Sequence, residues 1–442
     1  MKTINTKNRI IKTKIPAPGT SKIIKSLKKN ESRSMQGQLP IVWKSAEGHS
    51  LFDIAGNKFI DFTSTIFVTN IGHSNTVLIK NLKRALDKKL LHSYAYLNSS
   101  REKYLKSLVK FAGKNFDKAF LMSAGTEATE AALKLMRLHG QREKKRRLGI
   151  ICINGNWHGR TMGAQMMSGN KEQKKWIGYE DKNIHHIDFP YPWELKNKSP
   201  KEFLFKSLKN LEKKINLKKD ICGFMLETFQ GWGAIFYPKE FVKEISKFCK
   251  KNKILLAFDE MQAGFGRTGK KFGYEHYNVL PDLICCGKGM GGGIAVSGVI
   301  GKKKIMDLPS VGNMSSTNSA NPLACVAGLS VLEEIKNKQI LKKVNKNGTY
   351  LKKGLVSIMK KNSNAVKYVL GKGMVYALIF DNKIKDIGKK LKKVCFASMQ
   401  KGLLVVYTGR ESIKIGPPLT ISKKAIEEGL EILDDEIIKV FK

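Results

Sequence analysis

The sequence predicts an α/β protein whose larger domain is a wound, largely parallel sheet and whose smaller domain is α+β. Two observations predict this class. Between about residues 117 and 301, short apolar runs, most of them β-branched, alternate with helix-length segments, and uninterrupted apolar runs are typical of strands covered on both faces. Beyond residue 336 the pattern changes to a few short strands among long amphipathic helices.

The N-terminal elements come first. Residues 1–38 are basic and contain no acidic residue before Glu31, so we expect a solvated N-terminal arm. Strands are expected at Leu51–Ile54 and Lys58–Phe62 around a tight turn, followed by a helix at Val77–Leu90. The chain is thereby divided into the arm, the N-terminal part of the small domain at 39–75, the large domain at 76–335 and the C-terminal small domain at 336–442.

The later elements share the same apolar or amphipathic patterns. Strands of the sheet are expected at Lys118–Met122, Gly149–Ile153, Ile221–Leu226, Ile254–Phe258, Leu283–Cys286 and Val296–Ile300. Further elements are expected at Pro322–Ile335, Leu341–Met359, Val375–Phe380, Ile387–Met399, Leu403–Val406 and Lys423–Phe441. Because ligands of parallel sheets bind at the carboxyl ends of the strands, residues directly after the strands are the first candidates for function.

Composition and charge exclude several classes of protein. A chain of 442 residues that is 42% hydrophobic can bury a core, so it is not disordered. The formal charge of +44 raises the question of nucleic acid or an anionic membrane, but 70 of the 81 basic residues are lysines spread along the whole chain. We therefore expect neither as a specific partner. The seven cysteines form no CxxC pair, which is typical of a cytoplasmic protein without disulfides or a metal site.

Two turns after strands have the residues of a site for a flat, phosphorylated ligand. The turn Ser123–Ala128 opens a helix, where free backbone N–H groups and the helix dipole attract phosphate. In it Gly125 permits close approach and Thr126 adds a hydroxyl. Trp157 follows the next strand and offers a platform for a planar ring. A capped helix start and a buried tryptophan are the commoner explanations of either signal alone.

Two charged side chains follow buried strands. Asp259 needs a cationic partner there, and a protonated ring nitrogen supplies one. Lys288 stands between two glycines, where desolvation lowers its pKa toward that of a nucleophilic amine. A phosphate cradle, a ring platform, a carboxylate and an amine that forms a Schiff base together predict pyridoxal 5′-phosphate as the cofactor.

From about Leu51 to its C-terminus, the chain resembles the class III aminotransferases, a family of fold type I pyridoxal-phosphate enzymes. The matching motifs are Asp61-Phe62, Asn70-Ile71-Gly72-His73, Ser123–Ala128, Trp157-His158-Gly159-Arg160-Thr161, Glu227 with Gln230-Gly231, Phe258–Gly269, Pro281-Asp282, Thr317 with Asn321-Pro322-Leu323-Ala324, and Pro417-Pro418-Leu419. The resemblance implies a mainly parallel seven-stranded sheet between helices, and a small α+β domain built from both chain ends.

The resemblance also implies the chemistry of individual residues. Lys288 would hold the cofactor and then move a proton during transfer, and Asp259 would pair with the ring nitrogen. Gln262 would bind the ring hydroxyl. Glu227 and Arg267 are expected to form ion pairs within the scaffold rather than to act on the substrate. The reaction would be a ping-pong transfer of an amino group from an ω-amine or amino acid to a keto acid or aldehyde.

Phosphate and ring recognition follow from the same resemblance. Trp157 would stack on the ring, while Gly125 and Thr126 would bind the phosphate. Thr317 would reach the phosphate of the neighbouring subunit, which makes a homodimer the catalytic unit.

The sequence departs from the family at two positions that recognise glutamate and 2-oxoglutarate. Many members carry an arginine shortly before the Pro-Pro-Leu motif and a glutamate two residues after the glutamine of the Gln-Gly pair. Here these positions are Lys414 and Trp232. Because lysine lacks the bidentate fork of arginine, we hypothesise that 2-oxoglutarate is not the preferred acceptor, or that Arg410 substitutes. Trp232 suits a donor with an apolar or extended body.

Two other functions remain open from the sequence. An aminomutase or a decarboxylase of the same fold uses the same Lys288 and Asp259. A basic binding protein that kept the fold and lost the chemistry explains the charge, but it has no need of a desolvated lysine.

Overall fold

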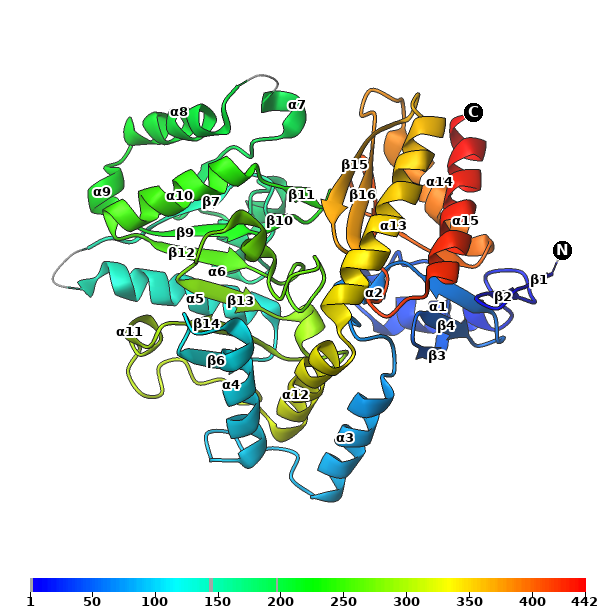
Figure 1. Cartoon of the computed structure of the whole chain (residues 1–442), viewed down its shortest axis with the longest axis horizontal. Helices are drawn as coiled ribbons and strands as arrows, with labels where there is room; N and C mark the ends of the chain where they lie inside the picture. The colour runs from blue at the N-terminus through cyan, green and yellow to red at the C-terminus, as the bar shows by residue number, and fades with distance from the viewer. Residues whose placement is uncertain (1–2, 143–145, 196–197) are drawn as a thin grey trace. The chain divides into compact units, whose positions relative to one another are not determined.

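The computed structural model describes residues 3–142, 146–195 and 198–442, and the chain divides into two compact units (Figure 1). The small unit comprises Met1–Thr76, Trp232–Ala234 and Lys342–Lys442, and the large unit comprises Val77–Gly231 and Ile235–Leu341. The three residues Trp232–Ala234 lie within the segment that the sequence assigned to the large domain, yet they cluster with the small unit.

The large unit is built on a seven-stranded sheet in the order β6-β14-β13-β12-β9-β7-β8. Its strands are β6 (Lys118–Met122), β14 (Ser297–Gly301), β13 (Leu283–Cys286), β12 (Leu255–Asp259), β9 (Ile221–Glu227), β7 (Gly149–Ile153) and β8 (Ile184–Ile187). Strand β14 is antiparallel to both of its neighbours, and the other pairings are parallel. The predicted class, a largely parallel sheet covered by helices, is confirmed. A short hairpin of β10 (Phe229–Gln230) and β11 (Ile235–Phe236) follows β9.

The helices differ widely in length. In chain order they are α1 (Thr20–Asn30), α2 (Ser64–Phe67), α3 (Thr76–Asp87), α4 (Ser99–Ala112), α5 (Gly125–Gly140), α6 (Met162–Met167), α7 (Pro192–Leu195), α8 (Pro200–Glu212), α9 (Leu217–Asp220), α10 (Lys239–Asn252), α11 (Lys303–Met306), α12 (Pro322–Asn337), α13 (Ile340–Lys361), α14 (Ile387–Gln400) and α15 (Lys423–Phe441).

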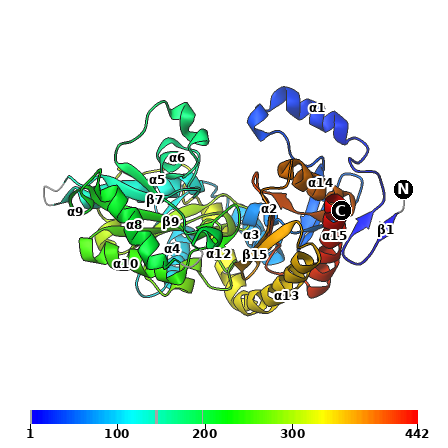
Figure 2. The ribbon, with the colours of Figure 1, turned by 90° about the horizontal axis from the view of Figure 1, so that it is seen from above.

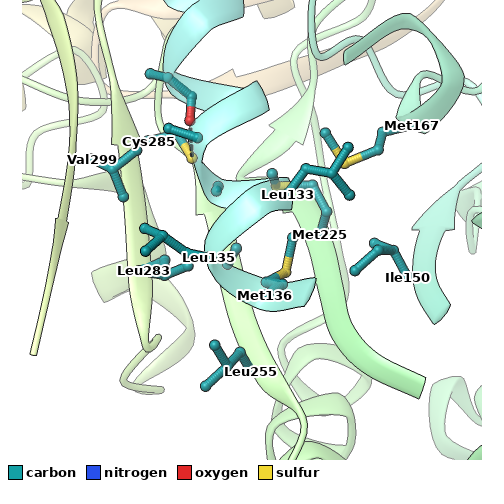
Figure 3. Packing of buried hydrophobic residues seen from close by; sticks show 14 of the residues in the cluster. Leu133, Leu135, Met136, Ile150, Met167, Met225, Leu255, Leu283, Cys285 and Val299 are labelled. Atoms are coloured by element: carbon teal, nitrogen blue, oxygen red, sulfur yellow. Dashed lines mark hydrogen bonds between the residues drawn. The ribbon is translucent and has the colours of Figure 1, made fainter. Parts of the chain in front are cut away.

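Helix α5 packs against one face of the sheet and forms the main hydrophobic core of the large unit with it. Its Leu135 and Met136 lie among Met225, Leu283 and Val299 of three strands (Figure 3). Burial of each such side chain contributes roughly 1.5–3 kcal/mol relative to an exposed one. Because this helix begins directly after β6, its packing fixes where its N-terminal turn lies.

The small unit contains two antiparallel-rich sheets. One has the path β1 (Ile4–Asn5), β2 (Ile10–Ile11), β5 (Lys58–Asp61), β4 (Ser50–Asp53) and β3 (Trp43–Glu47), with β17 (Leu403–Leu404) also paired to β5. The other has the order β15 (Val366–Lys372), β16 (Val375–Phe380), β19 (Ser412–Ile415) and β18 (Val406–Tyr407). Both chain ends therefore build this unit.

Within the N-terminal segment 1–38, the part at residues 4–17 is not the solvated arm that the charge suggested. Strands β1 and β2 extend a sheet, and Ile11 and Ile15 are only 2% and 5% exposed within an apolar cluster. Arg9 Nε donates to Glu428 Oε1 at 2.6 Å. The prediction was wrong because burial of a few isolated isoleucines outweighs the solvation of the lysines between them. Helix α1 and the residues that follow it, 31–38, are largely exposed, and Figure 2 shows α1 at the outside of the small unit.

Within the described ranges, none of the helices combines the length and the hydropathy that a membrane span requires. The same part of the chain holds no cluster of three or more His, Cys, Asp or Glu placed to bind a metal ion.

Candidate active site

Strand register brings the candidate residues to one edge of the large unit's sheet. Glu227 at the end of β9 lies opposite Asp259 at the end of β12, and Asp259 lies opposite Cys285 in β13, three residues before Lys288. A cavity of 310 Å³ opens at this edge, and it is lined by Gly125, Thr126, Trp157, His158, Gly159, Arg160, Glu227, Asp259, Met261, Gln262 and Lys288. Every cofactor-binding residue expected from the sequence, apart from Thr317, lies in this lining.

Lys288 occupies an unusual backbone position. Its φ of 44° lies in the left-handed region, which costs a residue other than glycine about 1 kcal/mol. Burial lowers the pKa of Lys288, while the nearby carboxylates of Asp259 and Glu227 act in the opposite direction. A lowered pKa increases the fraction of neutral amine, the form that attacks a carbonyl carbon.

Asp259 is held by two hydrogen bonds from within the protein. Its Oδ1 accepts the backbone N–H of Met261 at 3.0 Å, and its Oδ2 lies 2.9 Å from Nδ1 of His158. Because an ionised carboxylate only accepts, Nδ1 of His158 carries the proton. The cationic ring nitrogen expected from the sequence is therefore not the only partner of Asp259, because His158 and Asp259 are both below 5% exposed and bonded to each other.

His158 itself was missed as a site residue. It belongs to the Trp-His-Gly-Arg motif, but the spacing of that motif does not indicate that the His158 ring contacts the end of β12, about a hundred residues later. Its Nε2 is buried, with no hydrogen-bond partner in the described part of the chain.

Glu227 is surrounded by donors rather than by a guanidinium. Its Oε2 accepts the N–H groups of Trp157 at 3.0 Å and Gly231 at 3.5 Å, and its Oε1 accepts the amide of Gln262 at 3.4 Å. Burial, followed by the charge of Asp259, raises the pKa of Glu227 to about 8. The expected scaffold ion pair of Glu227 is not found among the described residues, whereas Arg267 is fully buried inside the scaffold.

This raised pKa predicts a specific pH dependence of stability. The carboxyl of Glu227 titrates at about 8 in the native state and near its ordinary value of 4.5 when unfolded. Across that window the unfolded state has lost a proton that the native state keeps, so the free energy of unfolding falls as pH rises from about 4.5 to about 8 and is constant above. Glu227→Gln, which mimics the protonated form, is expected to remove that part of the fall.

Urea denaturation of the cofactor-free protein at steps of pH measures the effect. The difference in unfolding free energy between native protein and variant should change by a few kcal/mol over the window, while other titrating groups cancel in the difference. The exposed Glu212→Gln is the matched control and should give a flat difference. A flat difference for Glu227→Gln as well would contradict the prediction.

The turn before α5 has the features of a phosphate cradle. Glu127 Oε2 accepts the N–H groups of Ser123 and Ala124 at 2.9 and 2.7 Å, which leaves those of Gly125 and Thr126 as first-turn donors at the cavity. A Cβ atom on Gly125 would lie 2.8 Å from Sδ of Met261, so any larger residue there would require the Met261 side chain to move. An amine, a carboxylate, an aromatic ring and these donors on one cavity fit pyridoxal phosphate.

Arg160 is a second cavity residue whose role the sequence does not reveal. Its guanidinium lies 4.5 Å from the centre of the Trp157 ring, and the side chain is exposed at the cavity. Among the described residues, no carboxylate forms an ion pair with it. The cavity thus carries a stacked cation that is available to an acidic ligand.

The remaining predicted residues lie outside the cavity lining. In the small unit, the Arg410 guanidinium lies 3.7 Å from the centre of the Trp232 ring and 3.0 Å from Glu411 Oε1. Lys414, on β19, is 7% exposed, with Nζ 4.9 Å from the ring of Phe67. Thr317 belongs to the large unit, where its side chain is exposed and its carbonyl oxygen lies 2.8 Å from Nε2 of His92.

The chain is similar to known aminotransferases in both sequence and fold. The chain matches the family model of class III aminotransferases over residues 32–437. The acetylornithine aminotransferase of Caldanaerobacter subterraneus subsp. tengcongensis is 32% identical over 406 residues, which cover 91% of this chain and 95% of that protein. A Bacillus anthracis aminotransferase shares the fold with a TM-score of 0.87 at 22% identity, over 97% and 100% of the chains. An amine transaminase from an uncultivated Pseudomonas species, in its PLP-bound form, has a TM-score of 0.83 at 23% identity, over 92% and 96%.

Proposed function

The chain belongs to the class III aminotransferases, and from that premise we propose that it takes the ω-amino group of an amino acid of the ornithine type. The enzyme is a transaminase that uses pyridoxal 5′-phosphate and moves an amino group between an amine and a keto acid. The observation that supports the finer proposal is the presence of Lys288, Asp259 and the stacked guanidinium of Arg160 on one cavity.

Each residue of the cavity has a separate role in the reaction. When bound, pyridoxal phosphate supplies an electron sink for the carbon that loses its proton. Lys288 attaches the cofactor and, once released, carries a proton at Nζ to and from the reacting carbon. Asp259, oriented by His158 and the N–H of Met261, holds a proton on the ring nitrogen. The N–H groups at the start of α5 bind the phosphate, and Trp157 supports the ring.

Arg160 supports a donor that carries a carboxylate. A guanidinium binds a carboxylate through two parallel hydrogen bonds, and stacking on Trp157 holds its plane in place. The relative from Caldanaerobacter is named for acetylornithine, an amino acid with its reacting amine at the far end from the carboxylate. Such a donor places its amine at Lys288 and its carboxylate at Arg160.

The acceptor is proposed to be a small keto acid other than 2-oxoglutarate. Lys414 and Trp232 stand where the resemblance expects an arginine and a glutamate. The amino group of Lys414 lies against the ring of Phe67, and Arg410 already contacts both Trp232 and Glu411. Lysine has no bidentate fork, and one nitrogen of the Arg410 guanidinium already bonds Glu411.

A homodimer in the cytoplasm completes the proposal. The exposed Thr317 is absent from the cavity of its own chain, which supports its expected role at the phosphate of a neighbouring subunit. All seven cysteines are buried and unpaired, which supports a reducing compartment.

Two separate half-reactions, followed by the absorbance of the bound cofactor, test the substrates. Ornithine and N-acetylornithine should convert the cofactor, whereas putrescine, which lacks the carboxylate, should react poorly. Arg160→Ala should raise the KM for the two amino acids about 10- to 100-fold, because a hydrogen bond to a charged group contributes about 1.5–3 kcal/mol. It should leave putrescine unaffected. In the second half-reaction, pyruvate should exceed 2-oxoglutarate.

Controls keep the two parts of this test separate. Arg142→Ala, an exposed arginine outside the cavity, should leave every KM unchanged. Equal rates for putrescine and ornithine would overturn the proposed donor. A strong preference for 2-oxoglutarate that is lost in Lys414→Ala would overturn the proposed acceptor. Transfer of labelled amine to added keto acid excludes an aminomutase.

A further inference from the structure

A second cavity of the large unit shares no lining residue with the cavity at Lys288. Its volume is 690 Å³, more than twice that of the active-site cavity and within the range of small-molecule sites. The lining comes mainly from β8, from a short 3₁₀ helix at Glu172–Ile177 with the turn after it, and from the end of α8. None of these residues takes part in the reaction described above, so the active site does not account for this cavity.

The lining of this second cavity carries more uncompensated positive than negative charge. Its charged members are Lys171, Glu172, Lys174, Lys175, Glu180, Asp181 and Lys214. Two of the three carboxylates are already paired, Glu172 with Lys175 at 2.7 Å and Asp181 with a guanidinium outside the lining at 2.6 Å. The three other lysines form no ion pair within the described ranges, and Glu180 is the one carboxylate of the lining left to balance them.

Lys174 is the least exposed of these three lysines. Its side chain is half-buried, and among the described residues its Nζ makes one hydrogen bond, to the carbonyl of Met166 at 3.1 Å, although an ammonium has three protons to donate. Burial lowers the pKa of Lys174, and the charge of Lys171 acts in the same direction. An anion in the cavity would stabilise this ammonium, because it supplies both the opposite charge and the missing acceptors.

The two histidines of β8 contribute polar groups to the lining rather than charge. Burial lowers the pKa of His186 to about 4 and also lowers the pKa of His185, so both rings are neutral at pH 7. Nε2 of His186 lies 3.1 Å from the carbonyl oxygens of Met167 and Ser168, and since a carbonyl only accepts, Nε2 carries the proton. The positive charge of the lining therefore comes from its lysines.

We propose that this second cavity binds a diphosphate group, with Lys171, Lys174 and Lys214 as its cationic ligands. Three lysines without ion pairs match an anion of several charges better than a single carboxylate, and lysine binds phosphate as a point charge without the fork of arginine. Free diphosphate and the diphosphate of a nucleotide share this chemistry. The inference is independent of the proposed function, because no residue of the active-site cavity takes part.

Calorimetric titration with pyrophosphate tests the site on the holoenzyme, at constant ionic strength and after gel filtration has removed excess cofactor. Lys174→Met keeps the side-chain length without the charge, and it should weaken binding about tenfold, the effect of one hydrogen bond to a charged group. Lys174→Arg should restore most of the affinity. Glu180→Gln removes the opposing charge of the lining and should tighten binding about threefold, a gain that loss of structure would not produce.

Two consecutive lysines provide the matched control. Lys213 and Lys214 are both exposed, but only Lys214 lines the cavity. Replacing either by alanine removes one positive charge from the same stretch, so attraction to the net charge of +44 changes equally. Lys214→Ala should weaken pyrophosphate binding about threefold, the effect of one exposed charge, and Lys213→Ala should not. Arg160→Ala should also leave the affinity unchanged, because its guanidinium belongs to the active-site cavity.

Chemical acetylation of lysines, followed by peptide mass spectrometry, locates the bound anion. Pyrophosphate should protect Lys174 and Lys214 from acetylation, but not Lys213. ADP distinguishes the two sources of the diphosphate. Binding of ADP about tenfold tighter than pyrophosphate assigns a nucleotide, whose ribose and base occupy the remaining volume, whereas equal or weaker binding assigns free diphosphate.

Several results would contradict the proposed site. Equal losses of affinity in Lys213→Ala and Lys214→Ala would show that pyrophosphate responds only to the net charge. Native affinity in Lys174→Met, or weaker binding in Glu180→Gln, would exclude this cavity as the place of binding. Absence of pyrophosphate binding to the native holoenzyme would also overturn the proposal. Circular dichroism establishes that each variant is folded, and the variants at the exposed Glu180 and Lys214 keep the test open if Lys174→Met is not.

Discussion

Lys288→Ala is expected to lower the rate of the first half-reaction by about 10⁴-fold, the upper range for a positioned proton-transfer group. The variant loses the amine that attaches the cofactor and the atom that moves the proton, whereas the rest of the cavity lining is unchanged. Removal of the left-handed lysine leaves an alanine in the same backbone conformation, so the fold should persist. Single-turnover absorbance measures the rate, and borohydride reduction followed by peptide mass spectrometry measures attachment.

A second lysine gives a matched control for this result. Burial also lowers the pKa of Lys174, but its Nζ donates to the carbonyl of Met166 and lines another cavity. Lys174→Ala should therefore keep both the adduct and the rate. Added methylamine should partly restore proton transfer in Lys288→Ala, which a misfolded protein would not allow. A reduced adduct on another lysine, at native rate, would end the assignment.

Asp259→Asn is expected to lower the same rate by about 10³-fold, within the range for electrostatic stabilisation of charge in a closed site. The amide keeps the shape of the side chain but lacks the charge that holds a proton on the ring nitrogen. Its oxygen can still accept one of the two bonds from His158 and Met261. The proton on the ring nitrogen is no longer stabilised by a negative charge. The visible absorption of the bound cofactor should therefore change more readily with pH.

His158→Leu tells whether the orientation of Asp259 matters as well as its charge. With the carboxylate intact but held only through the N–H of Met261, the rate should fall about tenfold and the spectrum should stay near native. Equal losses in Asp259→Asn and His158→Leu would mean that the pair acts as one charged unit. No loss in Asp259→Asn would exclude the proposed role of the carboxylate.

The sheet and its site edge were predictable because the information is local. Strands such as β12 and β13 are unbroken apolar runs, and the polar residues after them stand at their carboxyl ends. Strand β8 was not predicted, since its sequence Ile-His-His-Ile carries two histidines at an edge. The N-terminal strands were hidden by lysines that surround a few buried isoleucines.

The parts of the site that the sequence did not reveal depend on contacts between distant segments. His158 reaches Asp259 across 101 positions, and Thr161 meets both Thr126 and Glu130 across 35 and 31. A motif shows that these residues are present, but only the packing of α5 and α6 against the sheet determines which atoms meet. Arg160 is a similar case, because its position over the Trp157 ring decides its availability.

The backbone at position 288 bears on how such a fold diverges. At this position the left-handed backbone has a lower free energy with glycine than with lysine. Lysine therefore persists there only under selection for what its side chain does. A descendant that kept the architecture and abandoned catalysis would be released from that constraint, and glycine would be the favoured replacement. The identity of the residue at this position therefore distinguishes descendants that still catalyse the reaction from those that have lost the activity.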